Sequence, residues 1–391
     1  MTPLFRKFVG INWLLFATMA ALLIAGVVAI YSAVEFREEA AFNSLWRKQV
    51  IMIGIGMVVF FVAALIDYKW VRWGAIPLYG AGLVLLVVVQ LAGTEVNSSR
   101  SWLNLGGFRF QPSQAAMGAG ILMLAFVLAE LNKFHPILRN HFLRLLIAGI
   151  VGGVPCLLVL KEGDFGSASV WLPVMGAMLF VGSIPMRYII TIVLLGLMVV
   201  PLVYFFKLED YQQARITTAL NVLQGKEIDR QGEGYATYHI TNAIGSAGWD
   251  GKGFLASRVE GQKSIHRMGF LPKNTAHNDY IFAVIAEEHG FRGCMVLLGT
   301  LAGLMLQGIW VAFRSRDPLG RLIAIGTTSL LFAHTFQHVG MQVHLLPITG
   351  LPLPFISYGG SFLIISLFLM GMTQSVWIHR NVPVEKKKER D

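Results

Sequence analysis

The stretch from Ile11 to Ala33, INWLLFATMAALLIAGVVAIYSA, contains no charged side chain. A helix needs roughly 20 apolar residues to cross about 30 Å of hydrocarbon, so this stretch predicts a membrane span. It is too long for the apolar region of a signal peptide, and we expect it to be retained as the first span. The whole chain shares this character, because 55% of its 391 residues are hydrophobic and 14% are charged, against about 25% charged residues in a soluble domain.

Hydropathy therefore predicts an all-α polytopic membrane protein with about ten transmembrane helices in one domain, residues 1–391. The expected spans are 11–33, 49–66, 73–92, 112–131, 143–161, 166–183, 186–206, 291–313, 320–345 and 355–378. The segment 207–277, between the seventh and eighth spans, is mostly polar and contains no spanning run. A long segment of this kind inside a compact protein is usually functional.

Lysine and arginine indicate the orientation. They concentrate in the N-terminal segment, in alternate short loops and in the tail 379–391, which are therefore expected in the cytoplasm. Both termini are then cytoplasmic, and the loop 207–277 lies outside. The net charge of +10 favours an anionic lipid surface over nucleic acid, because much of it sits in such loops and in the tail. Cys156 and Cys294 lie in apolar segments, which argues against a disulfide framework.

Two polar clusters follow the first spans. Ser99 to Ser113, SRSWLNLGGFRFQPS, leads from an outer loop into the fourth span. Its aromatic residues suit an interfacial anchor, whereas Arg100 and Arg109 favour binding an anion such as a phosphate. Asp164, in KEGDFGSA, is either a helix N-cap or a functional carboxylate at membrane depth.

Two more clusters follow the polar loop. The first contains Asp279, Glu287 and Glu288, in HNDYIFAVIAEEHGF, and Gly290 is expected to end or kink this segment. A carboxylate at the mouth of an apolar bundle can act as a base, although a solvated helix start is an equal alternative. The second, Leu345 to Ser361, LLPITGLPLPFISYGGS, predicts irregular backbone that forms a re-entrant wall, with Ser357, Tyr358 and Ser361 as its polar groups.

Several common chemistries have no motif here. The sequence lacks GxxxxGK[ST], HExxH, paired CxxC and GxSxG. His334, His338 and His344 lack ligand partners at a persuasive spacing, so they are expected to be packed or hydrogen-bonded.

Together, six strings resemble the SEDS family (shape, elongation, division and sporulation) over nearly the whole chain. They are FRFQPS, GDFGSA, YQQARI, GYATYHITNAIGSAGWDGKGF, MGFLPKNTAHNDYIFAVIAEEHGF and LLPITGLPLPFISYGGS. The chain looks more like the elongation branch, RodA, than the division branch, FtsW. The resemblance implies a ten-span peptidoglycan glycosyltransferase that polymerises lipid II at the outer face of the bacterial plasma membrane, with a class B penicillin-binding protein as its transpeptidase partner.

The resemblance also implies roles for residues. The family's essential carboxylate falls on Asp279, its acid after the fifth span on Asp164, and its loop cations on Arg215 and Lys252. We expect Asp279 to be the general base of an inverting transfer. Arg215, Arg109 and Lys252 are the candidates to stabilise the departing diphosphate. Further substrate contacts are predicted at Asp164, Glu287, Ser357 and Tyr358. No cofactor is certain; a divalent cation, Mg²⁺ or Mn²⁺, bridging Asp279 or Glu288 to the diphosphate stays open.

Four positions depart from the family pattern, and one of them is Asn278, where HND stands in place of the usual HTD. Gln114 and Met117 replace an acid and a base that usually lie one helical turn apart, and His338 replaces a usual asparagine. Losing both charges together is physically coherent, because losing one would leave an unpaired buried charge at a cost of several kcal/mol. The change casts doubt on a requirement for that pair in activity.

Two other functions compete with polymerisation. A transporter (flippase) of lipid II also fits ten spans, intramembrane acids and Gly/Pro-broken segments. A non-catalytic scaffold for a penicillin-binding protein is the third candidate. Purified protein with lipid II in detergent separates them, because only the enzyme makes glycan there without its partner.

Overall fold

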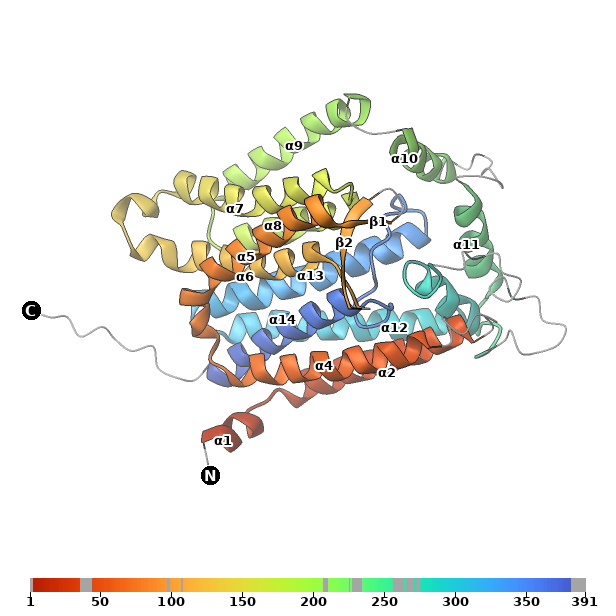
Figure 1. Ribbon diagram of the computed structural model, residues 1–391, viewed down its shortest axis with the longest axis horizontal. Helices are drawn as coiled ribbons and strands as arrows, with labels where there is room; N and C mark the ends of the chain where they lie inside the picture. The colour runs from red at the N-terminus through yellow and green to blue at the C-terminus, as the bar shows by residue number, and fades with distance from the viewer. Residues whose placement is uncertain are drawn as a thin grey trace, which may run out of the picture.

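The computed structural model describes residues 3–35, 44–96, 99–106, 108–206, 210–224, 226, 234–255, 264, 271 and 275–380. Within these residues the chain is mostly helical (Figure 1). The helices are α1 Pro3–Val9, α2 Trp13–Val34, α4 Leu45–Leu65, α5 Val71–Ala92, α6 Pro112–Glu130, α7 His141–Lys161, α8 Phe165–Val181, α9 Met186–Phe206, α10 Asp210–Leu223, α11 Tyr235–Ser246, α12 Ile281–Arg314, α13 Pro318–Gln342 and α14 Gly360–His379. Short 3₁₀ turns lie at Tyr68–Trp70, Leu131–Lys133 and Pro136–Arg139.

The expected membrane fold class is confirmed. In the described part of the chain, eight helices are long and apolar enough to span a membrane, and α8 and α9 contribute two shorter apolar stretches, Phe165–Val181 and Met186–Met198. Together they fall where ten spans were expected.

Two helices begin five or more residues away from the start predicted from hydropathy. Helix α12 begins at Ile281, ten residues before the expected 291, and continues through a break at Gly290, where φ is 62° and ψ is −162°. The acidic pair Glu287 and Glu288 lowered the hydropathy of its first turns without ending the helix. Helix α14 begins at Gly360 instead of residue 355, because the preceding Pro- and Gly-rich segment is irregular. The break in α12 confirms the kink that was predicted at Gly290.

The bundle is organised around α6, α13 and α14, whose spanning segments are 78%, 67% and 72% buried. Helix α4 runs along α14, and α5 along α6 (Figure 1). Gly371 permits the close approach of α14 to α4, since a Cβ there would lie 2.5 Å from the carbonyl oxygen of Phe60. Such small residues at helix contacts are typical of membrane bundles. Helix α9 lies apart from the bundle, and residues 191–198 are exposed.

A small antiparallel sheet was not expected in an all-α fold. Strands β1 Thr94–Val96, β2 Ser99–Leu105 and β3 Phe108–Phe110 pair in the order β1-β2-β3. The turn between β2 and β3 contains Gly106 at φ 57°, a left-handed conformation that glycine adopts without steric cost. The sheet occupies the segment expected to be an interfacial anchor, and it leads directly into α6.

The end of the bundle opposite this sheet contains a separate cluster of ion pairs. Arg72 Nε lies 3.2 Å from Glu130 Oε1, and Arg72 Nη2 lies 3.4 Å from Asp317 Oδ2. These contacts join α5, α6 and the start of α13. Arg72 therefore balances acids of α6 and of the start of α13, and the acids discussed below lie at the end that contains the sheet.

Candidate active site

Asp279 lies in the turn that precedes α12. Its backbone N–H donates to the Thr275 carbonyl at 2.8 Å, and its own carbonyl accepts from Gln342 Nε2 at 2.9 Å. Gly350, at φ 68°, lies beside its carboxylate, because a Cβ on Gly350 would be 3.5 Å from Asp279 Oδ2. The side chain is only partly buried. The backbone around this carboxylate is thus fixed from both α13 and the segment after it.

The irregular segment 345–361 packs directly on this turn, as its predicted role as a wall requires. Ser357 Oγ donates to the Asn278 carbonyl at 2.7 Å and accepts from the Leu353 N–H at 2.8 Å. The Tyr358 N–H donates to the His277 carbonyl at 3.0 Å, and the two rings lie 5.5 Å apart. Ser357 is buried, so its hydroxyl supports the wall and does not face an open site.

Asp164 approaches the same segment from α8. One carboxylate oxygen accepts from the Ser167 N–H at 2.9 Å, which makes Asp164 the N-cap, and the other accepts from Gln111 Nε2 at 3.0 Å. Gly166 contacts the segment 345–361, since a Cβ there would lie 2.5 Å from the Thr349 carbonyl oxygen. Burial raises the pKa of Asp164, and the bonds from Ser167 and Gln111 oppose that shift. The N-terminus of α8 and the Asp279 turn therefore lie on either side of residues 349–350.

Glu162 is a neighbouring acid that the sequence analysis did not single out. It is 4% exposed, and neither carboxylate oxygen has a hydrogen-bond partner among the described residues. Burial, and then the charge of Asp164, raise the pKa of Glu162 to about 8. A carboxyl group in this setting holds a proton near neutral pH. Its position two residues before Asp164 in KEGDFGSA was the available signal.

Arg109 supplies an exposed cation at the edge of the wall. It is the middle residue of β3, and its carbonyl accepts from Ser361 Oγ at 3.4 Å, which joins β3 to the start of α14. Burial raises the pKa of Tyr358, and the positive charge of Arg109 opposes that shift. The guanidinium therefore acts electrostatically on the segment that borders Asp279. Arg215 lies in α10, but its side chain lies outside the described residues.

Lys252 was expected to be a cation available to the substrate, and the structure instead pairs it with Glu287. The two charged atoms are 2.7 Å apart, and the side chains are 18% and 2% exposed. The Lys252 N–H also donates to the Glu287 carbonyl at 2.8 Å. The charge of Lys252 is therefore balanced within the protein by Glu287.

Glu288 is also engaged. It accepts a hydrogen bond from the Ser32 hydroxyl of α2 and another from the Leu255 N–H at 3.2 Å. In the described parts of the chain, no three His, Cys, Asp or Glu side chains are close enough together to hold a metal ion. The pairing of Glu288 away from Asp279 does not fit a protein-built cation site, so we derive no step through a metal.

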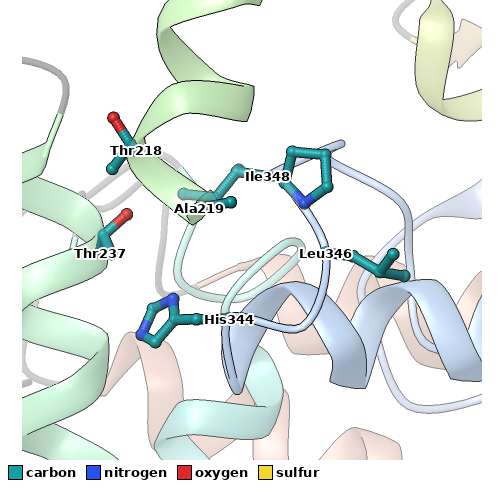
Figure 2. A pocket seen from close by; sticks show the side chains of 7 residues that line it. Thr218, Ala219, Thr237, His344, Leu346 and Ile348 are labelled. Carbon is teal, nitrogen blue, oxygen red and sulfur yellow. The ribbon is translucent and has the colours of Figure 1, made fainter. Parts of the chain in front are cut away.

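A small pocket lies beside the same wall (Figure 2). It is lined by Thr218, Ala219, Thr237, His344, Leu346, Pro347 and Ile348, from α10, α11 and the segment after α13. His344 Nε2 lies 2.6 Å from Thr241 Oγ1, and burial lowers the pKa of His344. This histidine is therefore packed and hydrogen-bonded, as expected from the sequence.

Gln114 and Met117, the two residues of α6 that depart from the family pattern, are uncharged and buried. Gln114 is buried and lies 3.5 Å from Ser167 Oγ, at the limit of a hydrogen bond, while Met117 joins the apolar core. Gln111 and Gln342, which bond the two acids or their backbone, were missed by the sequence analysis. Gln111 lies in the string FRFQPS but was given no role there, and Gln342 lies in none of the six strings. An amide shows its role only when its partners are placed.

Comparison with known proteins relates this arrangement to a family. Residues 12–382 match the family FTSW_RODA_SPOVE, described as "Cell cycle protein". The peptidoglycan glycosyltransferase MrdB of Escherichia coli K12 is 34% identical over 93% of this chain and 94% of its own length.

Two solved structures are also similar. A chain from "Structural coordination of polymerization and crosslinking by a peptidoglycan synthase complex" has a TM-score of 0.76 and 28% identity, covering 95% of this chain and 99% of that one. The rod shape determining protein RodA of Thermus thermophilus has a TM-score of 0.66 and 26% identity, covering 95% and 98%.

Proposed function

The chain belongs to the FtsW/RodA/SpoVE family and is a peptidoglycan glycosyltransferase of the SEDS type; on that premise we propose that it polymerises lipid II during cell-wall elongation, with Asp279 as the general base. The observation that supports this assignment most directly is the fixed backbone on both sides of Asp279, beside a carboxylate that is only partly buried. A base must be held in place and still reach a substrate hydroxyl.

The proposed reaction is a single displacement. Asp279 removes the proton from the 4-hydroxyl of one disaccharide. The oxygen of that hydroxyl attacks the anomeric carbon of another disaccharide. The bond from that carbon to the diphosphate breaks, and undecaprenyl diphosphate leaves with the electron pair. Inversion converts the α-linked donor into a β-linked polymer, so no covalent enzyme intermediate is needed. The diphosphate is a good leaving group and needs a cation more than an acid.

Arg109 is the described cation that best suits this role. It is exposed, and its charge acts on Tyr358 in the wall that borders Asp279. Arg215 is retained as a second cation on the strength of its motif. Lys252 is assigned a different role, because its charge is neutralised by Glu287. The electrostatic contribution of Arg109 is therefore expected to be larger than that of Lys252.

The site is proposed to face the outside of the bacterial plasma membrane, with both chain termini in the cytoplasm. The distribution of lysine and arginine supports this orientation. A class B penicillin-binding protein is the proposed partner, which would crosslink the strands made here. The similarity to a chain of a complex that couples polymerisation to crosslinking supports such a partnership.

The test is polymerisation of lipid II by the purified chain in detergent, with no membrane to cross. Asp279→Asn should abolish glycan formation and leave the unfolding temperature near that of the wild type. Asp250→Asn is the matched control, because Asp250 is 72% exposed and pairs with Arg292 at the surface; it should retain full activity. A fully active Asp279→Asn protein would falsify the base assignment. A wild-type chain that makes no glycan unless its partner polymerises would instead favour the scaffold.

A further inference from the structure

Two polar side chains in the interior of α13 form a continuous hydrogen-bonded path beside the active site. His338 and Gln342 are 0% and 1% exposed and lie one helical turn apart. His338 Nδ1 is 2.6 Å from the Leu351 carbonyl oxygen, and its Nε2 is 2.7 Å from Gln342 Nε2. Gln342 Nε2 donates to the Asp279 carbonyl at 2.9 Å, and Gln342 Oε1 accepts from the Ala283 N–H at 2.7 Å.

These contacts determine where each proton lies. The Ala283 N–H can only donate, so it must face the amide oxygen of Gln342, which puts the NH₂ group toward Asp279 and His338. One amide hydrogen bonds to the Asp279 carbonyl, which can only accept. The other points at His338 Nε2, so that nitrogen must be the acceptor. His338 is therefore the tautomer protonated on Nδ1, which donates to the Leu351 carbonyl.

The path reaches both sides of the Asp279 carboxylate. One end fixes the backbone of the turn at Asp279 and Ala283. The other end fixes Leu351, the residue after Gly350, which lies beside the same carboxylate. Neither side chain is placed to touch a substrate, because both are buried. Together, His338 and Gln342 control the separation between the Asp279 turn and the segment 345–361.

We propose that His338 and Gln342 are positioning residues, which together hold Asp279 and the segment Gly350–Leu351 in the arrangement that lets the carboxylate act as a base. This inference rests on the proposed function of Asp279. The pair is not interchangeable with apolar residues of similar size, since the Asp279 and Leu351 carbonyls accept hydrogen bonds from it. The Ala283 N–H donates both to Gln342 and to the Tyr280 carbonyl at 3.1 Å. An asparagine at position 338 carries its amide where the imidazole carries Nδ1, so it can still donate to the Leu351 carbonyl, whereas leucine cannot.

The test compares turnover with substrate affinity. Gln342→Met keeps the length of the side chain and removes all three hydrogen bonds, and His338→Leu removes both contacts of the imidazole. Each should lower kcat for lipid II polymerisation by tenfold or more, with KM changed less than twofold. His338→Asn should stay within about threefold of the wild type. Thr335→Val is the matched control on α13, because Thr335 Oγ1 bonds only within its own helix, to Leu331; it should leave kcat unchanged.

A second measurement guards against a variant that is merely unstable. Hydrogen exchange at residues 275–283 should accelerate in Gln342→Met and His338→Leu, while exchange in α6 stays as in the wild type. Should Gln342→Met fail to fold, the contrast between His338→Leu and His338→Asn decides the matter. Equal activity in those two proteins, or a rise in KM without a fall in kcat, would overturn the proposal.

The result also separates this inference from the function on which it rests. If Asp279→Asn is inactive and Gln342→Met turns over like the wild type, only the positioning role is wrong. If Asp279→Asn keeps its activity, the base assignment fails whatever the behaviour of His338 and Gln342.

Discussion

Replacing Lys252 with methionine tests whether this lysine is a structural partner of Glu287 or a cation that serves the substrate. Methionine keeps most of the apolar stem and removes the charge, which leaves the Glu287 carboxylate without the ammonium 2.7 Å away. Because Glu287 is 2% exposed, water cannot readily replace the lost partner. We expect the variant to be substantially less stable, and its remaining folded fraction to polymerise lipid II.

The magnitude follows from the burial of the pair. At an effective dielectric constant of about 20, two unit charges at this distance attract by about 6 kcal/mol before the cost of removing them from water. Desolvation offsets much of that gain, but removing one partner of a buried pair leaves the other charge uncompensated, at about 3–5 kcal/mol. Because Lys252 is 18% exposed, we expect the variant to lose stability at the lower end of this range, about 3 kcal/mol.

The assay is unfolding of the purified protein in detergent, together with the rate of glycan formation per folded molecule. Lys252→Met should unfold at a clearly lower temperature, and Lys252→Met combined with Glu287→Gln should recover most of the loss, because no charge is then left unpaired. Arg292→Met is the control, since it breaks the exposed pair with Asp250 and should cost less than about 1 kcal/mol. A Lys252→Met protein of wild-type stability that has lost its turnover would refute this reasoning and restore the lysine as a substrate cation.

Two further predictions concern Glu162 and the helix break. The pKa of Glu162 is raised from 4.5 to about 8 in the folded chain. The contribution of Glu162 to the stability of the fold is therefore fully present below pH 4.5, where the carboxyl is protonated in both states. This contribution is lost as the pH rises to 8. The loss in free energy of unfolding is up to about 5 kcal/mol. Glu162→Gln should remove this part of the pH dependence, and unfolding measurements between pH 5 and 9 would show the change. Identical pH profiles for the variant and the wild type would contradict this prediction. Gly290→Ala should prevent correct folding or cost several kcal/mol, because its Cβ would lie 2.3 Å from the Gly251 backbone nitrogen at φ 62°. Gly245→Ala in α11, where a Cβ meets nothing within 4 Å, should express and migrate on size-exclusion chromatography like the wild type, and an equally well-behaved Gly290→Ala protein would refute the strain.

The spans could be predicted because a membrane imposes a simple rule on composition. Every apolar run long enough to cross corresponds to a helix, and the kink at Gly290 followed from glycine in a helical pattern. The start of α12 was missed because hydropathy treats Glu287 and Glu288 as solvated. In the fold each carboxylate has its own partner, Lys252 or Ser32, so the helix extends through them.

The candidate site was only partly predictable, for a related reason. Asp279 and Asp164 stood out as acids at the ends of apolar runs, and the segment 345–361 stood out by its prolines and glycines. The ion pair of Lys252 could not be predicted, because nothing in the string GKGF reveals a partner 35 residues away at Glu287. The β2–β3 hairpin was missed because its short strands lie in a segment whose aromatic residues equally suit a membrane interface.

The way the sheet end of the bundle is held together explains why its glycines and amides matter as much as its acids. Residues 248–253 bond to both sides of the break at Gly290: the Phe291 N–H donates to the Gly248 carbonyl at 3.0 Å, and the Lys252 N–H donates to the Glu287 carbonyl at 2.8 Å. The break exposes backbone groups that a helix would normally satisfy, and residues 248–253 supply their partners.

The same principle applies at Asp279, where Gln342 bonds the backbone of the turn that precedes α12. The carboxylate proposed as the base thus gains its fixed position from buried side chains of neighbouring elements. Substitutions at these supports should therefore change turnover or folding without changing the chemistry of the site.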